Sequence, residues 1–269
     1  MPVIWRGGDV IVVDKPSGMA SEPGKGQRDN TMMNALFAEF GNLLQNMGEK
    51  RDFGLLHRLD RETSGLLIVA LRARAYDALR RQFEERSVVK RYWAIVSGRP
   101  PKAQGVIRKP IAEVVDEKKQ KKAVISGAGK PSATAYRVLS SRGGASLVEC
   151  RIGSGRLHQI RVHMAAVGCP VLGDGFYAPP EIKRMAARLA LHAHLLAFVE
   201  PESGERVVVG SPFPADLRPA LVGRRMPVPG EGSGARGTAQ GGGSGNQRAE
   251  PDVGWSEQND DESGDPGAA

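Results

Sequence analysis

The most constraining feature of this chain is an uninterrupted apolar run, Leu-Leu-Ile-Val-Ala-Leu, at residues 66–71. The run follows Gly65 and stops at Arg72, so it is too short for a typical helix and predicts a β-strand. Because it offers no polar face, the strand should be buried on both sides and lie near the centre of a sheet. The run is also far shorter than the ~20 apolar residues that a membrane-spanning helix needs.

Shorter apolar runs, set off by Gly, Pro, Ser or Asp, predict further strands at residues 10–13, 88–96, 105–110, 133–139, 146–152, 191–199 and 206–209. Helical spacing of apolar residues predicts helices near residues 32–40, 76–83, 158–167 and 181–187. We expect Asp29 or Asn30 to cap the first of these helices, and Gly168 to end the third. Many strands with few inserted helices indicate an α+β fold with a central mixed, largely antiparallel sheet.

Composition divides the chain near residue 225. From Met226 to Ala269 there is no Leu, Ile or Phe, and Gly, Ser, Asp, Glu and Gln dominate. Such a stretch cannot bury enough surface to offset the entropy lost on ordering. We therefore expect one folded domain over residues 1–225 and a disordered, Gly-rich acidic tail over residues 226–269.

The charge is unevenly distributed between these two parts. The tail holds two Arg and eight Asp or Glu, so the whole-chain charge of +8 corresponds to about +14 on residues 1–225. This excess favours a polyanionic partner through counterion release and electrostatic steering, with nucleic acid as the leading candidate. A basic surface that only aids solubility is the alternative.

Cysteine usage and the N-terminus bear on the compartment. Only Cys150 and Cys169 are present, and no charged-then-apolar leader follows Met1, so we expect neither a disulfide framework nor secretion. The two thiols are expected to be small buried hydrophobes. These features predict a cytoplasmic protein without a membrane association.

The most informative polar segment is His-Arg-Leu-Asp-Arg-Glu-Thr-Ser-Gly-Leu-Leu at residues 57–67. It places Asp60 between Arg58 and Arg61, in a loop directly before the buried strand. A carboxylate close to arginines is biased toward its ionised form, as a nucleophile or general base requires. By composition alone, an ordinary ion-paired loop acid explains the same residues.

A second polar segment, Gly-Arg-Leu-His-Gln-Ile-Arg-Val-His at residues 155–163, leads from a turn into the predicted third helix. Backbone N–H groups at such a helix start could face a phosphate, with Arg161 pointing elsewhere. A solvated, basic helix start is the alternative.

The histidines do not predict a metal site. His158 and His163 are five residues apart, so they do not share a helical face as a zinc-binding pair would. His192 and His194 are expected on alternating sides of a strand, at least one of them in a structural role. With two cysteines and no acidic metal-binding motif, we expect no metal.

Taken in order, these two polar segments and three others resemble the RluA-type pseudouridine synthases over about residues 10–214. Residues 12–18, VVDKPSG, resemble the family's opening strand and turn, and residues 57–67 resemble its H-R-L-D-x-x-T-S-G-L-L signature. The other matches are KRYWAIVSG at 90–98, GRLHQIRVH at 155–163 with GCPVLGDGFY at 168–177, and RLALHA at 188–193. Five ordered matches are more specific than any one alone.

The resemblance implies an isomerase that breaks the N1–C1′ bond of a uridine, turns the uracil and rejoins it through C5, without cofactor or metal. By this match Asp60 is the catalytic carboxylate, which attacks C1′ or removes a proton at C2′. Arg161 matches the arginine that pairs with the carboxylate and orients it, and Tyr92 matches the tyrosine packed under the uracil. Without the resemblance, Tyr92 would be a core aromatic and Arg161 a surface residue. The implied substrate-binding residues are His57, Arg58, Thr63, Arg156, His158 and Gln159.

The implied partner is structured RNA, ribosomal or transfer, bound by a monomer. Since C1′ and C5 are inaccessible in a stacked helix, the uridine must be extruded, and Arg58 matches a residue that can occupy the vacated stack. The basic run at residues 118–122 could follow the phosphate backbone or be a solvated loop. Because the match starts close to Met1, we expect the small N-terminal RNA-binding module of many relatives to be absent.

Two other functions fit parts of the pattern. A noncatalytic RNA-binding protein could keep this fold, although a pure binder has no need for Asp60 in an anion-binding cleft. A glycoside hydrolase usually requires two carboxylates that flank the scissile bond, and only Glu62 lies near Asp60 in the sequence.

Overall fold

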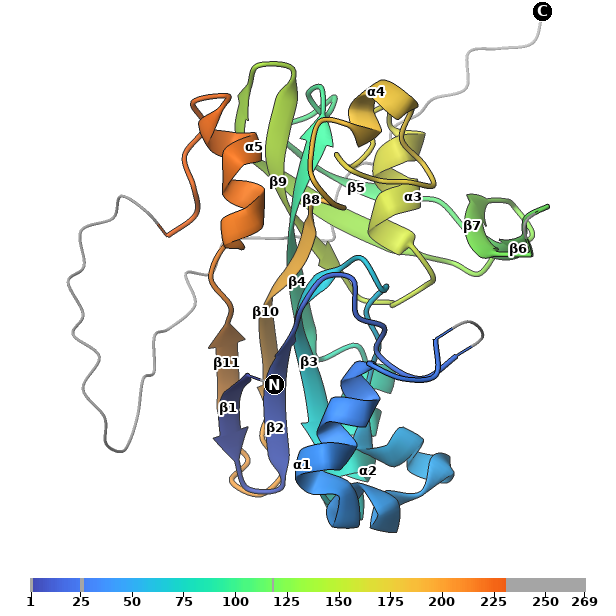
Figure 1. Ribbon diagram of the computed structural model, residues 1–269, viewed down its shortest axis with the longest axis vertical. Helices are drawn as coiled ribbons and strands as arrows, with labels where there is room; N and C mark the ends of the chain where they lie inside the picture. The colour runs from blue at the N-terminus through green and yellow to red at the C-terminus, as the bar shows by residue number, and fades with distance from the viewer. Residues whose placement is uncertain (1, 25–26, 118, 231–269) are drawn as a thin grey trace, which may run out of the picture. The chain divides into compact units, whose positions relative to one another are not determined.

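The computed structural model of the chain describes residues 2–24, 27–117 and 119–230. Its main feature is a nine-stranded sheet with the order β1-β2-β3-β10-β4-β9-β8-β5, in which β11 also pairs with β10 (Figure 1). The neighbouring strands of this sheet are antiparallel except β3 and β10, which are parallel. The expected α+β class with a largely antiparallel sheet is confirmed. The strands are β1 (Val3–Gly7), β2 (Val10–Lys15), β3 (Ser64–Ala70), β4 (Val89–Ser97), β5 (Gln104–Arg108), β8 (Ala133–Arg142), β9 (Ala145–Ile152), β10 (Leu191–Val199) and β11 (Arg206–Gly210).

Five α-helices are present in the described residues: α1 (Met32–Met47), α2 (Ala73–Glu84), α3 (Gln159–Ala166), α4 (Pro180–Lys183) and α5 (Arg218–Val222). Short 3-10 segments occupy Glu49–Gly54 and Ala215–Leu217. The spacing of apolar residues located α2 and α3 well. It underestimated the length of α1, and α4 is shorter than predicted.

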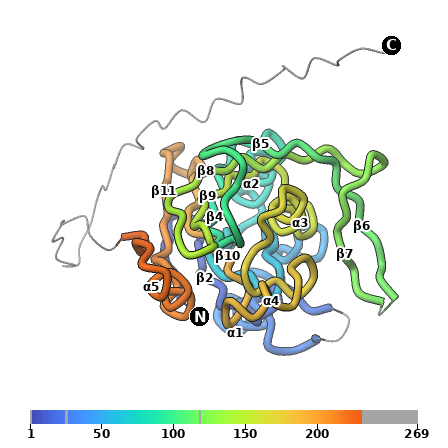
Figure 2. Tube along the Cα trace, turned by 90° about the horizontal axis from the view of Figure 1, so that it is seen from above, coloured from blue at the N-terminus to red at the C-terminus, as the bar shows by residue number. Residues whose placement is uncertain are grey.

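A two-stranded hairpin of β6 (Ile111–Val115) and β7 (Lys121–Ile125) lies beside α3, outside the main sheet (Figure 2). No sequence pattern predicted this hairpin, because both strands are short and neither alternates apolar with polar residues. Lys121 and Lys122 begin β7 and so are not in the expected loop, while Lys119 lies in the turn. Lys118 lies outside the described residues.

Strand β3 is buried along its whole length, as the apolar run predicts. Its residues alternate between two apolar clusters, one on each face of the sheet. Leu67 and Val69 pack in the cluster that contains Leu36 of α1, while Leu66 packs in the cluster that contains Leu79 of α2. The helices on both faces therefore hold this strand rigidly, and the loop before it is attached to a fixed support.

The start of α1 differs from the sequence expectation. Thr31, rather than Asp29 or Asn30, is the N-cap, and its hydroxyl accepts a hydrogen bond from the backbone N–H of Asn34 at 3.3 Å. The Asn34 side chain accepts in return from the backbone N–H of Thr31, which completes a capping box. Asn30 has a φ of 57° and turns the chain into this cap.

The two faces of β4 serve different parts of the fold. Adjacent strand residues point to opposite faces, so Tyr92 and Trp93 lie on opposite sides of the sheet. The Trp93 ring stacks on His194 with a centroid separation of 3.9 Å and lies 5.5 Å from Phe213, in the segment that leads to α5. His192 also stacks on Trp93, so the expected alternation of the two histidines was wrong: residues two apart on a strand share a face.

The end of the folded part is also later than expected. Met226 and Val228, which composition assigned to the tail, are buried in the main apolar cluster. The rest of the predicted tail, residues 231–269, lies outside the described residues. Within the part of the chain that the structure describes, no helix has the length and apolar character to cross a bilayer. Cys150 and Cys169 are buried free thiols, as expected.

Candidate active site

One cleft gathers most of the residues that the sequence singled out. It lies on the face of the sheet to which Tyr92 points, between the loop before β3 and the N-terminal end of α3. Asp60 is the one carboxylate among the described residues that line it, so a hydrolase pair with Glu62 is not present there. The lining residues are Arg58, Leu59, Asp60, Thr63, Tyr92, Ile152, Gly155, Arg156, His158, Gln159, Ile160, Arg161 and Leu191.

The centre of the site is a chain of ion pairs through Arg161. Its Nη1 donates to Oδ2 of Asp60 at 3.1 Å. Its Nε and Nη2 donate to the two carboxylate oxygens of Asp174, both at 2.8 Å, in a bidentate pair. The Arg161 and Asp174 side chains are 1% and 0% exposed, whereas Asp60 is 18% exposed. The buried Asp174 therefore fixes the guanidinium from the protein interior. Asp60 is the residue of this ion-paired group that solvent can reach.

Charge and hydrogen bonding keep the buried pair ionised. Burial disfavours the charged form of Arg161, but Asp174 and Asp60 together raise its pKa above the ordinary value. Burial likewise opposes ionisation of Asp174, yet the hydrogen bonds from Arg161 and from the backbone N–H groups of Phe176 and Tyr177 lower its pKa. The guanidinium lies 5.3 Å from the Phe176 ring and 5.5 Å from the Tyr177 ring, so aromatic faces enclose its remaining sides.

The Asp60 loop is held from both ends. The backbone carbonyl of Asp60 accepts a hydrogen bond from the N–H of Thr63 at 3.1 Å, which closes a turn directly before β3. Gly65 has a φ of 119°, and a Cβ there would lie 2.3 Å from the carbonyl oxygen of Ala193, so only glycine allows β3 and β10 to approach. The buried Lys15 ammonium donates to three carbonyl oxygens, including that of Arg61 at 3.3 Å. Burial lowers the pKa of Lys15 to about 8, while nearby Asp60 opposes this shift.

Tyr92 lines the cleft from β4 and is nearly fully buried. Burial and, secondarily, the negative charge of Asp60 raise the pKa of its phenol. The hydroxyl therefore stays protonated at neutral pH and is a donor or a flat support, and it is a poor base.

His158 connects the cleft to the β6–β7 hairpin. Its Nδ1 lies 2.9 Å from the Tyr177 hydroxyl, and that hydroxyl lies 3.0 Å from the carbonyl oxygen and 2.9 Å from the N–H of Ala123 in β7. The phenol has one proton, which it donates to the carbonyl, so it accepts from both the Ala123 N–H and His158. The proton of neutral His158 is then on Nδ1, and its Nε2 is an unprotonated acceptor 4.0 Å from Asp60 Oδ2.

The other predicted binding residues divide into two groups. Arg58 is exposed at the cleft and ion-paired with Glu22. The Thr63 hydroxyl and the Arg156 Nε are buried without a hydrogen-bond partner in the described residues, and both side chains line the cleft. All three side chains line the cleft.

His57 and Gln159 have structural contacts instead. The Nε2 of His57 accepts from the N–H of Ile68 at 3.2 Å, its ring lies against Phe83, and burial lowers its pKa to about 3. The Gln159 amide donates to the Ala133 carbonyl at 2.9 Å and accepts from the N–H of Arg156 at 3.1 Å. The N–H of Gln159 itself donates to the Arg156 carbonyl. The N–H groups of Arg156 and Gln159, at the entry to α3, are therefore not free to bind the phosphate that the sequence suggested.

Sequence reasoning assigned no role to Asp174, Tyr177 or Lys15. All three lie in segments that resemble the family, at residues 168–177 and 12–18, so the signal was present. Their roles depend on contacts with Arg161, His158 and the Asp60 loop that only the folded chain creates. Among the described residues, no three His, Cys, Asp or Glu side chains are grouped to hold a metal ion.

Comparisons with known proteins identify the family to which the chain belongs. A family model described as RNA pseudouridylate synthase matches residues 9–166. Ribosomal large subunit pseudouridine synthase D of Zymomonas mobilis is 38% identical over 226 residues, which cover 81% of this chain and 71% of that protein. An uncharacterized RNA pseudouridine synthase of Mycobacterium bovis is 40% identical over 224 residues, with 82% and 72% covered.

Solved structures show the same similarity. Human RNA pseudouridylate synthase domain containing 1 has a TM-score of 0.64 at 30% identity, over 78% of this chain and 82% of that one. Human RNA pseudouridylate synthase domain containing 4 has a TM-score of 0.66 at 25% identity, over 84% and 94%. The chain belongs to the RNA pseudouridylate synthase family, whose members are isomerases. Within that family, its similarity to the large-subunit synthases D confirms the RluA-type assignment.

Proposed function

We propose that this protein isomerises specific uridines of structured RNA to pseudouridine, with Asp60 as its catalytic carboxylate. The observation that supports the proposal most directly is the Asp60–Arg161 pair at 3.1 Å in a cleft that Tyr92 also lines. An accessible carboxylate held by a buried guanidinium is oriented before the substrate arrives, which lowers the cost of organising the transition state.

The chemistry requires one such carboxylate. The N1–C1′ bond breaks, the uracil turns, a C5–C1′ bond forms, and the proton lost from C5 is balanced by one gained at N1. Asp60 either attacks C1′ or removes a proton at C2′ that is later returned. Because the product is an isomer of the substrate, no electrons enter or leave, and the proposed reaction requires no redox cofactor. Tyr92, with its raised pKa, would support the uracil and donate a hydrogen bond.

Entry of the uridine requires base flipping, because C1′ and C5 are shielded inside a stacked helix. Arg58 is exposed beside Asp60, and its partner Glu22 comes from a different loop, so the side chain can exchange that ion pair for a stacking position. A planar guanidinium is suited to stack on neighbouring bases. The Thr63 hydroxyl and Arg156 Nε would complete the contacts to the extruded nucleotide.

Ribosomal RNA of the large subunit is the substrate that we favour, since relatives at 37–38% identity are named large-subunit synthases. We further propose that the protein acts in the cytoplasm, as a monomer. Transfer RNA is the other substrate to be tested.

The test is pseudouridine mapping of all cellular RNA from a strain without this gene, complemented with the wild-type protein, Asp60→Asn or Glu62→Gln. We expect the wild type and Glu62→Gln to restore the same sites and Asp60→Asn to restore none, with the folds of all three verified by circular dichroism. Restoration by Asp60→Asn would refute the catalytic assignment. RNA binding without any site restored by the wild type would favour a noncatalytic binding protein.

A further inference from the structure

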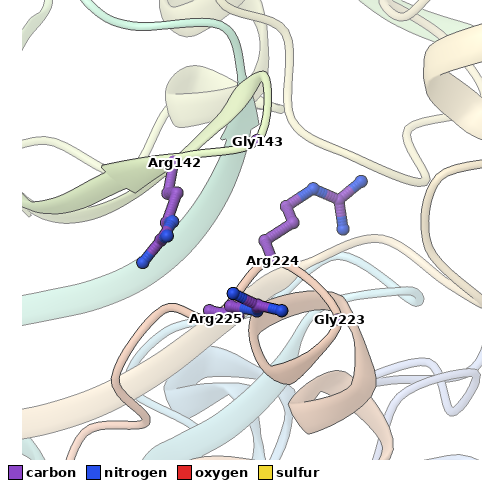
Figure 3. A pocket seen from close by; sticks show the side chains of 5 residues that line it. All are labelled: Arg142, Gly143, Gly223, Arg224 and Arg225. Atoms are coloured by element: carbon purple, nitrogen blue, oxygen red, sulfur yellow. The ribbon is translucent and has the colours of Figure 1, made fainter.

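A second cationic site lies outside the cleft, between the β8–β9 turn and the end of α5. It is an open hollow of about 570 Å³ lined by Arg142, Gly143, Gly223, Arg224 and Arg225. Figure 3 shows the three arginines, one from the end of β8 and two from the segment after α5, around the same opening. Within the described chain, no carboxylate lines the hollow, and Arg142 and Arg225 make no side-chain hydrogen bond or ion pair.

The backbone places these arginines firmly. Two buried residues, Leu221 and Met226, anchor the segment that carries Arg224 and Arg225. Arg224 donates to the carbonyl of Ala220 at 2.8 Å, and a Cβ on Gly143 would lie 3.1 Å from the Arg224 side chain, so the turn packs directly on this arginine. The hollow is therefore a fixed feature of the surface, formed where two elements meet.

Arg225 occupies a conformation in which glycine would be more stable. The N–H of Met226 donates to the carbonyl of Leu221 and the N–H of Arg225 to that of Val222, which is the double hydrogen bond of a Schellman motif. Arg225 is the left-handed residue of this motif, with a φ of 53°. Glycine is the usual residue there because any Cβ is strained. A strained, exposed arginine whose guanidinium has no partner in the described chain is the observation from which we infer a functional contact.

The hollow is separate from the catalytic cleft. Figure 2 shows α5, which leads into the hollow, on one side of strands β4, β8 and β9, and α3, which borders the cleft, on the other. Along β9, the cleft residue Ile152 lies seven residues from Ala145 beside the turn, which is about 23 Å at roughly 3.3 Å per residue. The flipped nucleotide and its immediate neighbours cannot span that distance and also pass to the other face.

We propose that this arginine hollow binds backbone phosphates of a second segment of the substrate RNA, remote from the target uridine. The inference rests on the proposed function for the identity of the polyanion. Guanidinium groups are suited to phosphates, and several of them around one open hollow match a chain of phosphates better than a single small anion. The site would thus favour long, folded RNA over short stem–loops.

The test compares wild type, Arg225→Gly and Arg225→Ala, with Arg81→Ala as the control that removes an exposed charge from α2. Glycine relieves the backbone strain and should raise Tm by about 2–4 °C, whereas alanine should not. Both Arg225 variants should nevertheless bind a long large-subunit rRNA transcript about tenfold more weakly. The slope of log K against log salt should also fall by about 0.9 for each phosphate that the variant no longer neutralises. Different effects on stability with the same effect on binding exclude misfolding as the cause.

Turnover of a stem–loop that contains only the mapped target should be unchanged in all variants. The proposal is overturned if both Arg225 variants bind the long transcript like wild type, or if Arg81→Ala weakens binding equally. Weaker binding of the short stem–loop would also overturn it, because the hollow would then serve the cleft. If the wild type modifies neither RNA, the proposed function fails, while the binding data still decide the role of the hollow.

Discussion

The guanidinium of Arg161 divides its hydrogen bonds between Asp60, which faces the cleft, and Asp174, which is buried. The resemblance identified Arg161 and Asp60 as a pair from short motifs. It did not reveal that a second carboxylate holds the arginine, because Asp174 lies in a different segment and meets Arg161 only after folding. At the scale of single residues, the geometry of the site therefore depends on a group that never touches the substrate.

Replacing that anchor should lower stability and turnover together. Asp174→Asn leaves the buried Arg161 with one charged partner in place of two, at a cost of about 3 kcal/mol in the free energy of unfolding. At temperatures where the variant is folded, we expect kcat to fall about 10–100-fold with KM nearly unchanged, since Asp60 is misoriented and the binding surface remains. A KM effect alone would contradict the positioning role.

The same ion pair predicts a pH dependence. The pKa of Asp174 is lowered in the folded state, so its contribution to stability is present above the unfolded value of about 4 and is lost as pH falls through the folded pKa. The difference in unfolding free energy between wild type and Asp174→Asn should therefore shrink below about pH 4. Urea denaturation at a series of pH values measures it, and a constant difference would exclude the ion pair as its source.

His158 gives a second prediction for a single residue. Burial lowers the pKa of His158, so the ring is neutral at pH 7, and the Tyr177 hydroxyl selects the tautomer with the proton on Nδ1. Nitrogen-15 NMR of the imidazole should show this tautomer in wild type and its loss in Tyr177→Phe, which removes the acceptor. The same variant should increase hydrogen exchange at Ala123, because β7 loses its bonds to the phenol. An unchanged tautomer would disprove the assignment.

At the scale of elements, the sequence predicted those strands and helices whose whole length follows a single apolar pattern. The buried run of β3 and the amphipathic spacing of α2 are such cases. The cap of α1 was missed because Thr31 is followed by Asn34 rather than the Glu or Gln of the usual capping box, so Asp29 and Asn30 competed as candidates. β1 and the β6–β7 hairpin were missed because they are short and depend on their pairing partners.

The contact between β3 and β10 can be tested through its glycine. A Cβ on Gly65 would clash with the backbone of Ala193 and would also require a φ of 119°, so Gly65→Ala should destabilise the fold by about 3 kcal/mol or more. Gly98→Ala is the matched control: its φ is also positive, at 69°, but a Cβ there meets nothing within 4 Å. The control should cost only about 1 kcal/mol. Equal losses in denaturant titrations would show that backbone strain, and not the close approach of the strands, requires glycine.

At the scale of the whole molecule, the sequence predicted the fold class but not the strand order. The pairing of β3 with β10 joins residues more than a hundred positions apart, and no local pattern encodes it. The five family-like segments are spread along most of the chain, and several of them meet at one cleft only in this topology. The sequence predicted the net positive charge of the folded part. It did not predict that arginines gather in one hollow, because that depends on how the segment after α5 meets the β8–β9 turn.

Net charge provides a prediction for the complete chain. Residues 231–269 carry two Arg and eight Asp or Glu, so a variant that ends at Gly230 changes the formal charge from +8 to about +14. The more positive protein should associate faster with RNA at low salt, because long-range attraction steers the encounter. The difference in association rate should nearly vanish at ~1 M salt, where the Debye length is about 3 Å. Since the cleft lies within residues 58–191, single-turnover rates on saturating RNA should be equal for both proteins. Stopped-flow binding of both proteins at several salt concentrations measures this difference in association rate. Equal association rates at low salt would show that the acidic segment does not offset the basic surface.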